Sequence, residues 1–258
     1  MVIAMELIFD SHAHYYDERF DDDRDELLES LKNNGVGYVL GASSDMENSR
    51  LSVELAEKHP FMYASVGIHP HDAKDLKPAD IDELINLSNH EKVVAIGEIG
   101  LDYHYDYSPR DDQKRCFTEL LELAIKLDMP TIIHSREAHA DTLSVLKKYK
   151  PKGVVHCYTG SVEMVREIIN LGMYIGLDGP VTFKNAVMPV EVAKAVPLDR
   201  LLIETDCPYL APVPFRGKRC DSTMLIHVAE KIAEARGLTT DEIISATREN
   251  AMRLFGIK

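Results

Sequence analysis

Residues 7–14, with the sequence Leu-Ile-Phe-Asp-Ser-His-Ala-His, decide how the rest of the chain is organised. The three leading apolar residues predict a short buried strand, since the run is too brief for a helix. Side chains alternate between the two faces of a strand, so Asp10, His12 and His14 are predicted to share one face. Both imidazoles can then reach one metal ion, with the Asp10 carboxylate placed to orient a ligand. The alternative for such a pair is two histidines hydrogen-bonded in the mouth of a loop.

The length and composition of the chain predict a single domain spanning residues 1–258. Hydrophobic residues make up 45% of the sequence, enough to fill a sizeable core. Residues 1–6 do not begin a secretory signal, and no apolar stretch approaches the roughly 20 residues that cross a bilayer. The four cysteines lack zinc-ribbon or Cys-x-x-Cys spacing, which is typical of a reduced, cytoplasmic protein. Nothing in the sequence indicates a membrane partner or a stable protein partner.

The formal net charge of −14 excludes one class of function, that of a general nucleic-acid coat protein, which would be basic overall. It does not exclude a local positive site. The sum counts carboxylates that bound cations would neutralise.

Strand and helix patterns alternate along the chain without a linker between them. Eight strands are predicted: residues 7–9, 38–42, 62–69, 93–98, 131–134, 154–156, 174–177 and 201–206. Helices are predicted between them, among them 21–34, 78–89 and 109–127, and two more, near 221–236 and 241–255, close the chain. Eight strands with intervening helices in about 250 residues predict an α/β fold of the TIM (β/α)8 barrel type. An open doubly wound sheet is the alternative, but the Gly-rich phosphate loop that it favours is absent.

Residue types that bind metals stand at most of the predicted strand ends. In a parallel barrel the carboxyl ends of the strands meet on one face, where the chemistry takes place. The residues at these ends are His12, His14, His69, His71, Glu98, His134, His156 and Asp206. This concentration favours a metal site over scattered structural histidines.

Strand alternation also predicts which neighbouring side chains face the barrel centre. Ile96 is predicted to share the inward face with Glu98, and Glu204 lies one pleat below Asp206. An unpaired carboxylate there would be costly, so Glu204 is predicted to contact a ligand histidine rather than a metal. Cys157 and Cys207 have the opposite parity and are predicted to be core thiols that face the helices.

Six segments together resemble the TatD-type metal-dependent deoxyribonucleases. They read Asp-Ser-His-Ala-His, Gly-Ile-His-Pro-His, Gly-Glu-Ile-Gly-Leu-Asp, Ile-His-Ser-Arg, His-Cys-Tyr-Thr-Gly and Glu-Thr-Asp-Cys-Pro-Tyr-Leu. The resemblance runs in order from about residue 7 to residue 255. It implies two divalent cations: one held by His12, His14 and Asp206, the other by His134 and His156, with Glu98 bridging. Two departures, Tyr158 where Phe is common and Asp178 where a small residue is expected, bear on substrate preference.

The implied centre suits hydrolysis of a phosphodiester. Two cations that share a water lower its pKa toward neutrality and draw charge from a phosphoryl oxygen. Asp206 is predicted to accept the proton of the water, and Glu98 to act with it as a catalytic residue that joins the two cations. Histidine-rich ligation suits zinc or manganese, whereas the family is usually described as supported by magnesium.

Four residues outside the ligand set are predicted to contact the DNA substrate. His69 follows the third strand, and Arg136 lies two residues past His134 on the same face, where a guanidinium can bind phosphate. Arg216 and Lys218 belong to a basic loop, residues 215–219, after the eighth strand. A merely solvated loop is the alternative for these two.

The sequence leaves three functions open. The first is a deoxyribonuclease that trims strand ends exonucleolytically, as the resemblance implies. The second is a metal-dependent barrel hydrolase of another ester or amide, such as an aminoacyl ester or a lactone. The third is a binding module on an inactive barrel, against which six converging ligand residues argue.

Overall fold

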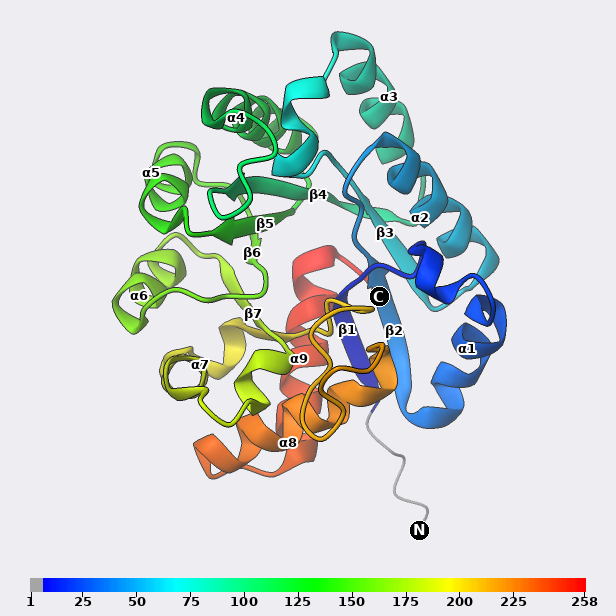
Figure 1. Cartoon of the computed structure of the whole chain (residues 1–258), viewed down its shortest axis with the longest axis vertical. Coiled ribbons are helices and arrows are strands. Elements are labelled where there is room, and N and C mark those ends of the chain that lie inside the picture. Colours follow the sequence, from blue (N-terminus) through cyan, green and yellow to red (C-terminus); the bar gives the residue numbers. More distant parts are fainter. Residues whose placement is uncertain (1–6) are drawn as a thin grey trace.

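Eight parallel strands pair in chain order, each with the next, in the computed structural model (Figure 1). They are β1 (Ile8–Ala13), β2 (Val36–Gly41), β3 (Met62–Val66), β4 (Val93–Asp102), β5 (Thr131–Arg136), β6 (Gly153–Val155), β7 (Tyr174–Leu177) and β8 (Leu201–Ile203). The last strand returns to the first, since Ala13 and Cys207 form a bridge and the His14 amide donates to the Cys207 carbonyl at 2.8 Å. The predicted (β/α)8 barrel is therefore confirmed. The doubly wound alternative is wrong, because its strands would not run in chain order.

The structure describes residues 7–258. The prediction that no targeting signal begins the chain falls on residues 1–6 and lies outside the described residues. Within the part that is described, no helix is both long and apolar enough to span a membrane.

Except for the last one, the helices cover the outside of the barrel (Figure 1). They are α1 (Arg24–Leu31), α2 (Met46–Lys58), α3 (Pro78–Ser88), α4 (Arg110–Lys126), α5 (His139–Tyr149), α6 (Val162–Asn170), α7 (Val187–Ala195), α8 (Leu225–Arg236) and α9 (Thr240–Phe255). Outward strand side chains and the inner faces of the helices form one large apolar cluster, in which Ile133 and Val155 pack with residues such as Phe117 and Leu120. This layer holds the strands in place from outside.

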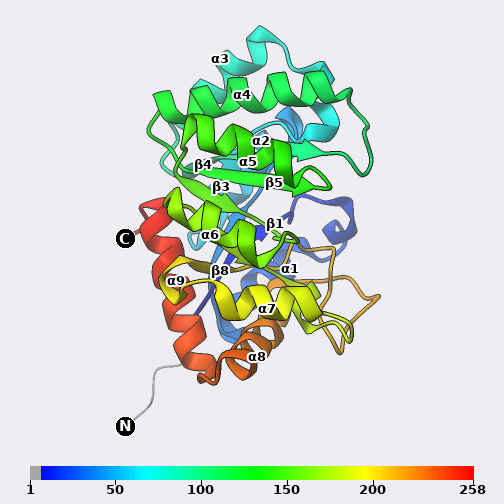
Figure 2. The same cartoon turned by 90° about the vertical axis from the view of Figure 1, so that its left-hand side faces the viewer.

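A second, smaller cluster fills the barrel interior. Seven strands contribute to it, through Phe9, Leu40, Ala95, Ile132, Val154, Tyr174 and Leu202. Helix α9 adds Ala251 and Phe255, and the ring of Phe255 stacks on that of Phe9 with 6.3 Å between centroids. Figure 2 shows α9 at the end of the barrel opposite the long loop that follows β8. The helix therefore closes one end and leaves the carboxyl ends of the strands open.

Two strands carry an irregularity immediately before a metal-binding residue type. The pairing of β1 with β2 shifts between Asp10 and Ala13, and that of β4 with β5 shifts between Ile96 and Ile99. Ile96 consequently packs in the outer cluster, and Ala95 packs in the interior. The predicted shared face of Ile96 and Glu98 is wrong, because a bulge changes the alternation of side chains along a strand.

Strand lengths differ from the prediction in ways that matter for the site. Strands β3, β6 and β8 end at Val66, Val155 and Ile203, so that His69, His156 and Asp206 stand in the loops just beyond them. Strand β4 instead continues four residues past Glu98, because Gly100 and Asp102 pair with β5.

Candidate metal centre

The Glu98 carboxylate lies at the middle of a histidine cluster at the open end of the barrel. Its Oε1 atom is 2.7 Å from His134 Nδ1, 2.7 Å from His156 Nε2 and 3.5 Å from His69 Nε2. Its Oε2 atom is 3.4 Å from His12 Nε2 and 3.9 Å from His14 Nε2. His12 and His134 lie on β1 and β5, and the other three imidazoles follow β1, β3 and β6, so one buried carboxylate connects the ends of four strands.

His12, His14 and Asp206, which are predicted to hold one cation, lie close together. His14 Nε2 lies 3.1 Å from Asp206 Oδ1, and His12 Nε2 lies 3.6 Å from the same atom. The other ring nitrogen of His14 is held by the Ala42 carbonyl and the Tyr16 hydroxyl, each at 2.9 Å. This second contact fixes the ring so that Nε2 faces the carboxylate. One ligand atom from each of His12, His14 and Asp206 lies within 4.8 Å of the others.

The second group contains one residue more than predicted. His134 Nδ1 lies 3.3 Å from His156 Nε2, and both rings contact Glu98, as the implied ligand set requires. His69, predicted as a substrate contact, is buried and forms a group of potential ligands with Glu98 and His134. The structure thus places His69 beside side chains that could hold a metal ion, and its predicted substrate contact stays a prediction.

Asp102 is the residue of this centre that sequence reasoning missed. Its Oδ2 atom lies 3.1 Å from His134 Nε2 and 3.1 Å from His71 Nε2, so the carboxylate orients both rings. Burial works against its charge, but the hydrogen bonds to His134 and His71 hold the pKa of Asp102 well below its usual value. The signal was in the sequence: Asp102 lies four residues after Glu98, on the same side of a strand that continues far enough.

In three residues of the centre, contacts between carboxylates and imidazoles outweigh the effect of burial on the pKa. Burial opposes ionisation of Glu98, yet the imidazoles of His156 and His69 hold its pKa well below the usual value. Burial likewise opposes the charged form of His156, yet the Glu98 and Glu204 carboxylates raise its pKa well above the usual value. The pKa of Asp206 is lowered in the same way, against burial, mainly by its hydrogen bond to His14.

The donor set fits a divalent cation. Imidazole nitrogens and carboxylate oxygens converge at separations of 2.7 to 3.9 Å. Nitrogen and oxygen ligands of this kind suit zinc and manganese, and carboxylates also suit magnesium. A cation would also relieve the repulsion among buried carboxylates, which is costly in a medium of low dielectric constant.

The two predicted supporting carboxylates behave differently. Glu204 lies inside the barrel as expected, with Oε1 3.7 Å from His156 Nδ1 and Oε2 accepting a hydrogen bond from Ser11 at 3.1 Å. Space for it comes from Gly176, where a Cβ would lie 2.5 Å from Glu204 Oε2. Asp10 instead accepts hydrogen bonds from the Thr205 and Ser222 hydroxyls, each at 2.6 Å.

The predicted common face of Asp10 with His12 is wrong, because the bulge in β1 intervenes. Asp10 contacts His12 only through the backbone amide, at 3.3 Å. It supports the first strand rather than orienting an imidazole.

The prediction for the two thiols holds for one of them. Cys207 is fully buried beside Tyr15 and Thr205. The thiol of Cys157, however, lies with carboxylate oxygens of Asp178 and Asp206 in a group within 4.8 Å. Cys157 has a positive φ of 42°, so strand alternation no longer applies there. Burial, with Asp178 and Asp206 beside it, raises the pKa of the Cys157 thiol well above its usual value.

Asp178, one of the departures from the family pattern, is almost fully buried. Its Oδ2 atom has no hydrogen-bond partner among residues 7–258. Burial, with Glu204 and Asp206 nearby, raises the pKa of Asp178 well above its usual value.

The remaining predicted substrate contacts lie around the mouth of the barrel. Arg136 is exposed at the end of β5, with its guanidinium carbon 4.8 Å from the centre of the Tyr105 ring. Arg216 and Lys218 are exposed on the loop after β8, and the Arg216 guanidinium stacks on Phe183 at 3.8 Å. A cavity of about 270 Å³ lies beside Arg216, bordered also by Lys184.

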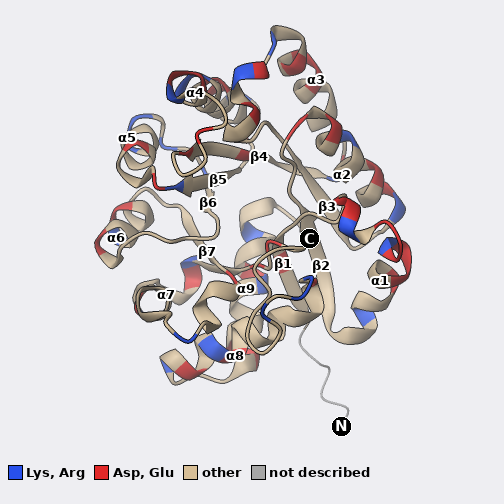
Figure 3. Ribbon diagram, viewed as in Figure 1, with Lys and Arg blue, Asp and Glu red and all other residues tan. Residues whose placement is uncertain are grey.

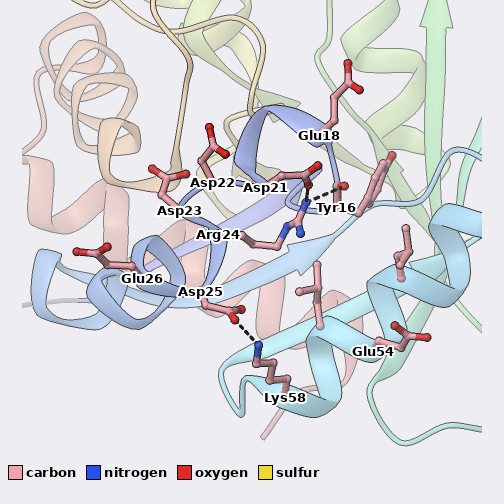
Figure 4. Close-up of a pocket in the computed structure, with 12 residues that line it drawn as sticks. Tyr16, Glu18, Asp21, Asp22, Asp23, Arg24, Asp25, Glu26, Glu54 and Lys58 are labelled. Atoms are coloured by element: carbon pink, nitrogen blue, oxygen red, sulfur yellow. Dashed lines mark hydrogen bonds and ion pairs between the residues drawn. The ribbon is translucent and has the colours of Figure 1, made fainter.

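A larger cavity of about 770 Å³ lies beside α1 and α2 and is strongly acidic (Figure 4). Its lining includes Glu18, Asp21, Asp22, Asp23, Asp25, Glu26 and Glu54, with only Arg24 and Lys58 as basic residues. Acidic residues, coloured red, are also concentrated around α1 in Figure 3. A polyanion would be repelled from this side of the molecule.

Known proteins related to this chain share its full length. The family described as TatD related DNase matches residues 9–256. YabD of Bacillus subtilis, described as an uncharacterized metal-dependent hydrolase, is 46% identical over 97% of this chain and 100% of its own length. The protein described as 3'-5' ssDNA/RNA exonuclease TatD of Salmonella typhimurium is 33% identical, over 97% and 99% of the two chains. The crystal structure of YJJV, a TatD homolog from Escherichia coli, matches with a TM-score of 0.91 at 30% identity, over 97% and 98% of the two chains.

Proposed function

This chain belongs to the TatD-related DNase family, and from that premise we propose that it is a metal-dependent deoxyribonuclease that hydrolyses DNA phosphodiester bonds from a strand end. The observation that carries the proposal is the position of Glu98. One of its oxygens contacts His134 and His156, and the other faces His12, so the carboxylate lies between two groups of ligands. A bridging carboxylate in a two-metal site must lie in such a position.

The proposed ligand sets follow from these contacts. His12, His14 and Asp206 would hold one cation, and His134 and His156 the other, with Glu98 touching both. Two cations so bound, whether zinc, manganese or magnesium, would lower the pKa of a shared water and polarise a phosphoryl oxygen.

The protein's own residues supply the proton transfer and the geometry. Asp206 accepts the proton of the attacking water at a carboxylate oxygen, since its lowered pKa keeps it ionised at neutral pH. Glu204 and Asp102 keep the His156 and His134 rings in orientation. Arg136 at the rim binds a phosphate near the cleaved bond.

Two further observations support the choice of a nucleic-acid substrate and its location. A Salmonella relative carries the description 3'-5' ssDNA/RNA exonuclease. Arg216 and Lys218 are exposed on one loop at the mouth, where they can hold flanking phosphates. The four cysteines are all unpaired thiols, which supports the proposal that the protein works in a reducing compartment, the cytoplasm.

A substrate panel tests the proposal. The purified protein is incubated with labelled single- and double-stranded DNA, with RNA, and with small carboxylic and aminoacyl esters, with and without chelator. We expect DNA to shorten from one end, chelator to stop the reaction and a divalent cation to restore it. Cleavage of the esters with no cleavage of any nucleic acid would favour the alternative of a hydrolase of another ester or amide.

A further inference from the structure

Two tyrosines after β4 form an exposed stacked pair at the mouth of the barrel. The side chains of Tyr105 and Tyr107 are 44% and 58% exposed, and their rings lie 5.1 Å apart at an angle of 18°. We call this pair the tyrosine ledge. Exposed aromatic surface of this kind commonly marks a binding site, since burying the rings elsewhere would be favourable.

The ledge is joined directly to the metal centre. His71 contacts both rings edge-on, at 5.4 Å from Tyr105 and 4.8 Å from Tyr107. The His71 Nε2 atom lies 3.1 Å from Asp102, and the same carboxylate oxygen lies 3.1 Å from His134 Nε2. Two side chains therefore separate the ledge from a ring that contacts Glu98.

The loop that carries the ledge is held by the same carboxylate. Asp102 Oδ1 accepts hydrogen bonds from the backbone amides of His104 and Tyr105, each at 3.0 Å. The Ser108 hydroxyl donates to the His71 carbonyl at 2.7 Å and closes the loop from its other end. The ledge is thus preorganised relative to the ligand His134, as a subsite next to a reacting group must be.

The charge around the mouth indicates where a nucleic-acid strand can pass. Arg136 lies over the Tyr105 ring of the ledge, with its guanidinium carbon 4.8 Å from the ring centroid. The α1 and α2 side carries the acidic cavity, which disfavours a phosphodiester chain (Figure 4). A strand that enters the centre is therefore favoured on the side of the ledge, where a cation and exposed aromatic surface are available.

We propose that the tyrosine ledge stacks an unpaired nucleobase of the substrate next to the bond that is cut, with Arg136 on the adjoining phosphate. This inference rests on the proposed nuclease function and specifies how that site holds its substrate. A base offers a π-face whatever its identity, so the subsite selects unpaired bases without reading sequence. A base inside a duplex is already stacked and paired, so a frayed or single-stranded end binds better.

Substrates that lack one base test the inference in the unmodified protein. Single-stranded oligonucleotides carry one abasic residue, moved stepwise away from the end that is degraded. Steady-state rates give KM and kcat for each. At one or two positions next to the cleaved bond we expect KM to rise about tenfold, the usual effect of losing one stacked base. Elsewhere the abasic residue should have little effect, since phosphate contacts are unchanged.

Variants then assign that effect to the ledge. Tyr105→Leu and Tyr107→Leu should raise KM for the intact strand. They should also remove most of the penalty, which is the rise in KM from the intact to the abasic strand, because no stacking remains to be lost. Tyr105→Phe and Tyr107→Phe keep the ring and should keep the penalty. Tyr149→Leu is the matched control, since Tyr149 also has a cation near its ring, Lys148 at 4.8 Å, but lies at the end of α5. It should behave as the unmodified protein.

The outcomes separate the two proposals. DNA cleavage with the same KM for intact and abasic strands at every position would overturn the proposed stacking on the tyrosine ledge. The proposed nuclease function would be unaffected. Leucine variants that keep the full penalty for the abasic strand would also overturn the proposed stacking, since the base would then be stacked elsewhere. An absence of cleavage of any nucleic acid by the unmodified protein would overturn both.

Discussion

The two carboxylate oxygens of Asp102 contact different parts of the candidate metal centre. One oxygen lies 3.1 Å from both His134 and His71, and the other fixes the loop that follows. Removing its charge should therefore loosen a ligand without deleting one. We expect Asp102→Asn to weaken binding of manganese or zinc to the metal-stripped protein by about 10- to 100-fold. Calorimetric titration measures the affinity.

The neighbouring carboxylate Asp106 offers a control for that variant. It is exposed and pairs with Arg110 at 2.8 Å on the surface. Asp106→Asn should leave metal affinity unchanged. Equal affinities for the unmodified protein and Asp102→Asn would show that the carboxylate only shapes the loop.

Glu98 is the residue on which both proposed cations depend. Glu98→Ala should lower bound metal and abolish turnover, since both groups of ligands lose their shared carboxylate. Elemental analysis should approach two divalent ions per chain in the unmodified protein and fall clearly below that in the variant. Circular dichroism checks that the barrel still forms, and Glu98→Gln serves as a second, isosteric variant. Full activity with almost no metal after resupply would contradict the two-metal proposal.

At the scale of single residues, the sequence predicted the centre better than its surroundings. His12, Glu98 and Asp206 could be brought together because parallel strands end on the same face of a barrel. Asp102 was missed because the strand was ended too early. Cys157 was misplaced because its backbone has left the strand, and a positive φ at a residue other than glycine is uncommon and carries no simple sequence signature.

At the scale of elements, alternation along the chain predicted the order of strands and helices, since apolar runs and their spacing survive in a single sequence. The bulges in β1 and β4 could not be predicted in this way. Each shifts the register of one strand against its neighbour, which depends on tertiary pairing rather than on composition. Helix α9 closes one end of the barrel, and we call it the plug. Its position could not be predicted either, because an amphipathic pattern does not say which surface the helix covers.

The plug can be tested through Phe255, which is buried and stacked on Phe9. Phe255→Ala should lower the free energy of unfolding by about 3–5 kcal/mol, the usual cost of deleting a buried aromatic ring. Denaturant titration measures the change. Metal stoichiometry should stay the same, because the plug lies at the end of the barrel opposite the centre. Arg253→Ala, on the same helix and directed to Asn250 at 3.1 Å, should cost much less.

The loop at residues 215–219 contains two kinds of basic residue. Arg219 pairs with Asp23 at 2.6 Å, whereas Arg216 and Lys218 contact aromatic rings and remain exposed. The double variant Arg216→Ala with Lys218→Ala should raise KM for DNA and reduce the salt dependence of binding. For single strands, each lost contact should reduce the slope of log K against log salt by about 0.7. A double variant with the slope of the unmodified protein would show that the loop is only solvated.

At the scale of the whole molecule, the carboxylates beside the histidines of the candidate metal centre make metal binding depend on pH. Burial opposes protonation of His14, His134 and His156, but the nearby carboxylates outweigh it and raise their pKa values in the metal-free protein. Protons thus compete with metal above the usual histidine pKa of about 6.5. Protonation of these rings stabilises the metal-free fold below that value, and this stabilisation is lost as pH rises through the raised pKa values.

The thermal stabilisation by metal should therefore grow with pH. The difference in Tm between metal-loaded and chelator-treated protein is expected to be larger at about pH 8 than at about pH 6. Scanning calorimetry in matched buffers measures it. A difference that shrinks over this range would mean that the imidazoles do not bind the metal.

The contact between the end of β1 and the segment after β8, which closes the barrel, has a consequence for the synthesis of the protein. His12 and His14 are made well before Asp206, which follows β8, and the two parts of this ligand group meet where the His14 amide donates to the Cys207 carbonyl. A ribosome-bound chain that has not yet released residue 207 cannot assemble that ligand group. Any hydrolytic activity that needs both cations is therefore withheld from nascent chains and from fragments that end early. The closing of the barrel is thus expected to limit the proposed activity to chains that include β8 and the loop that follows it.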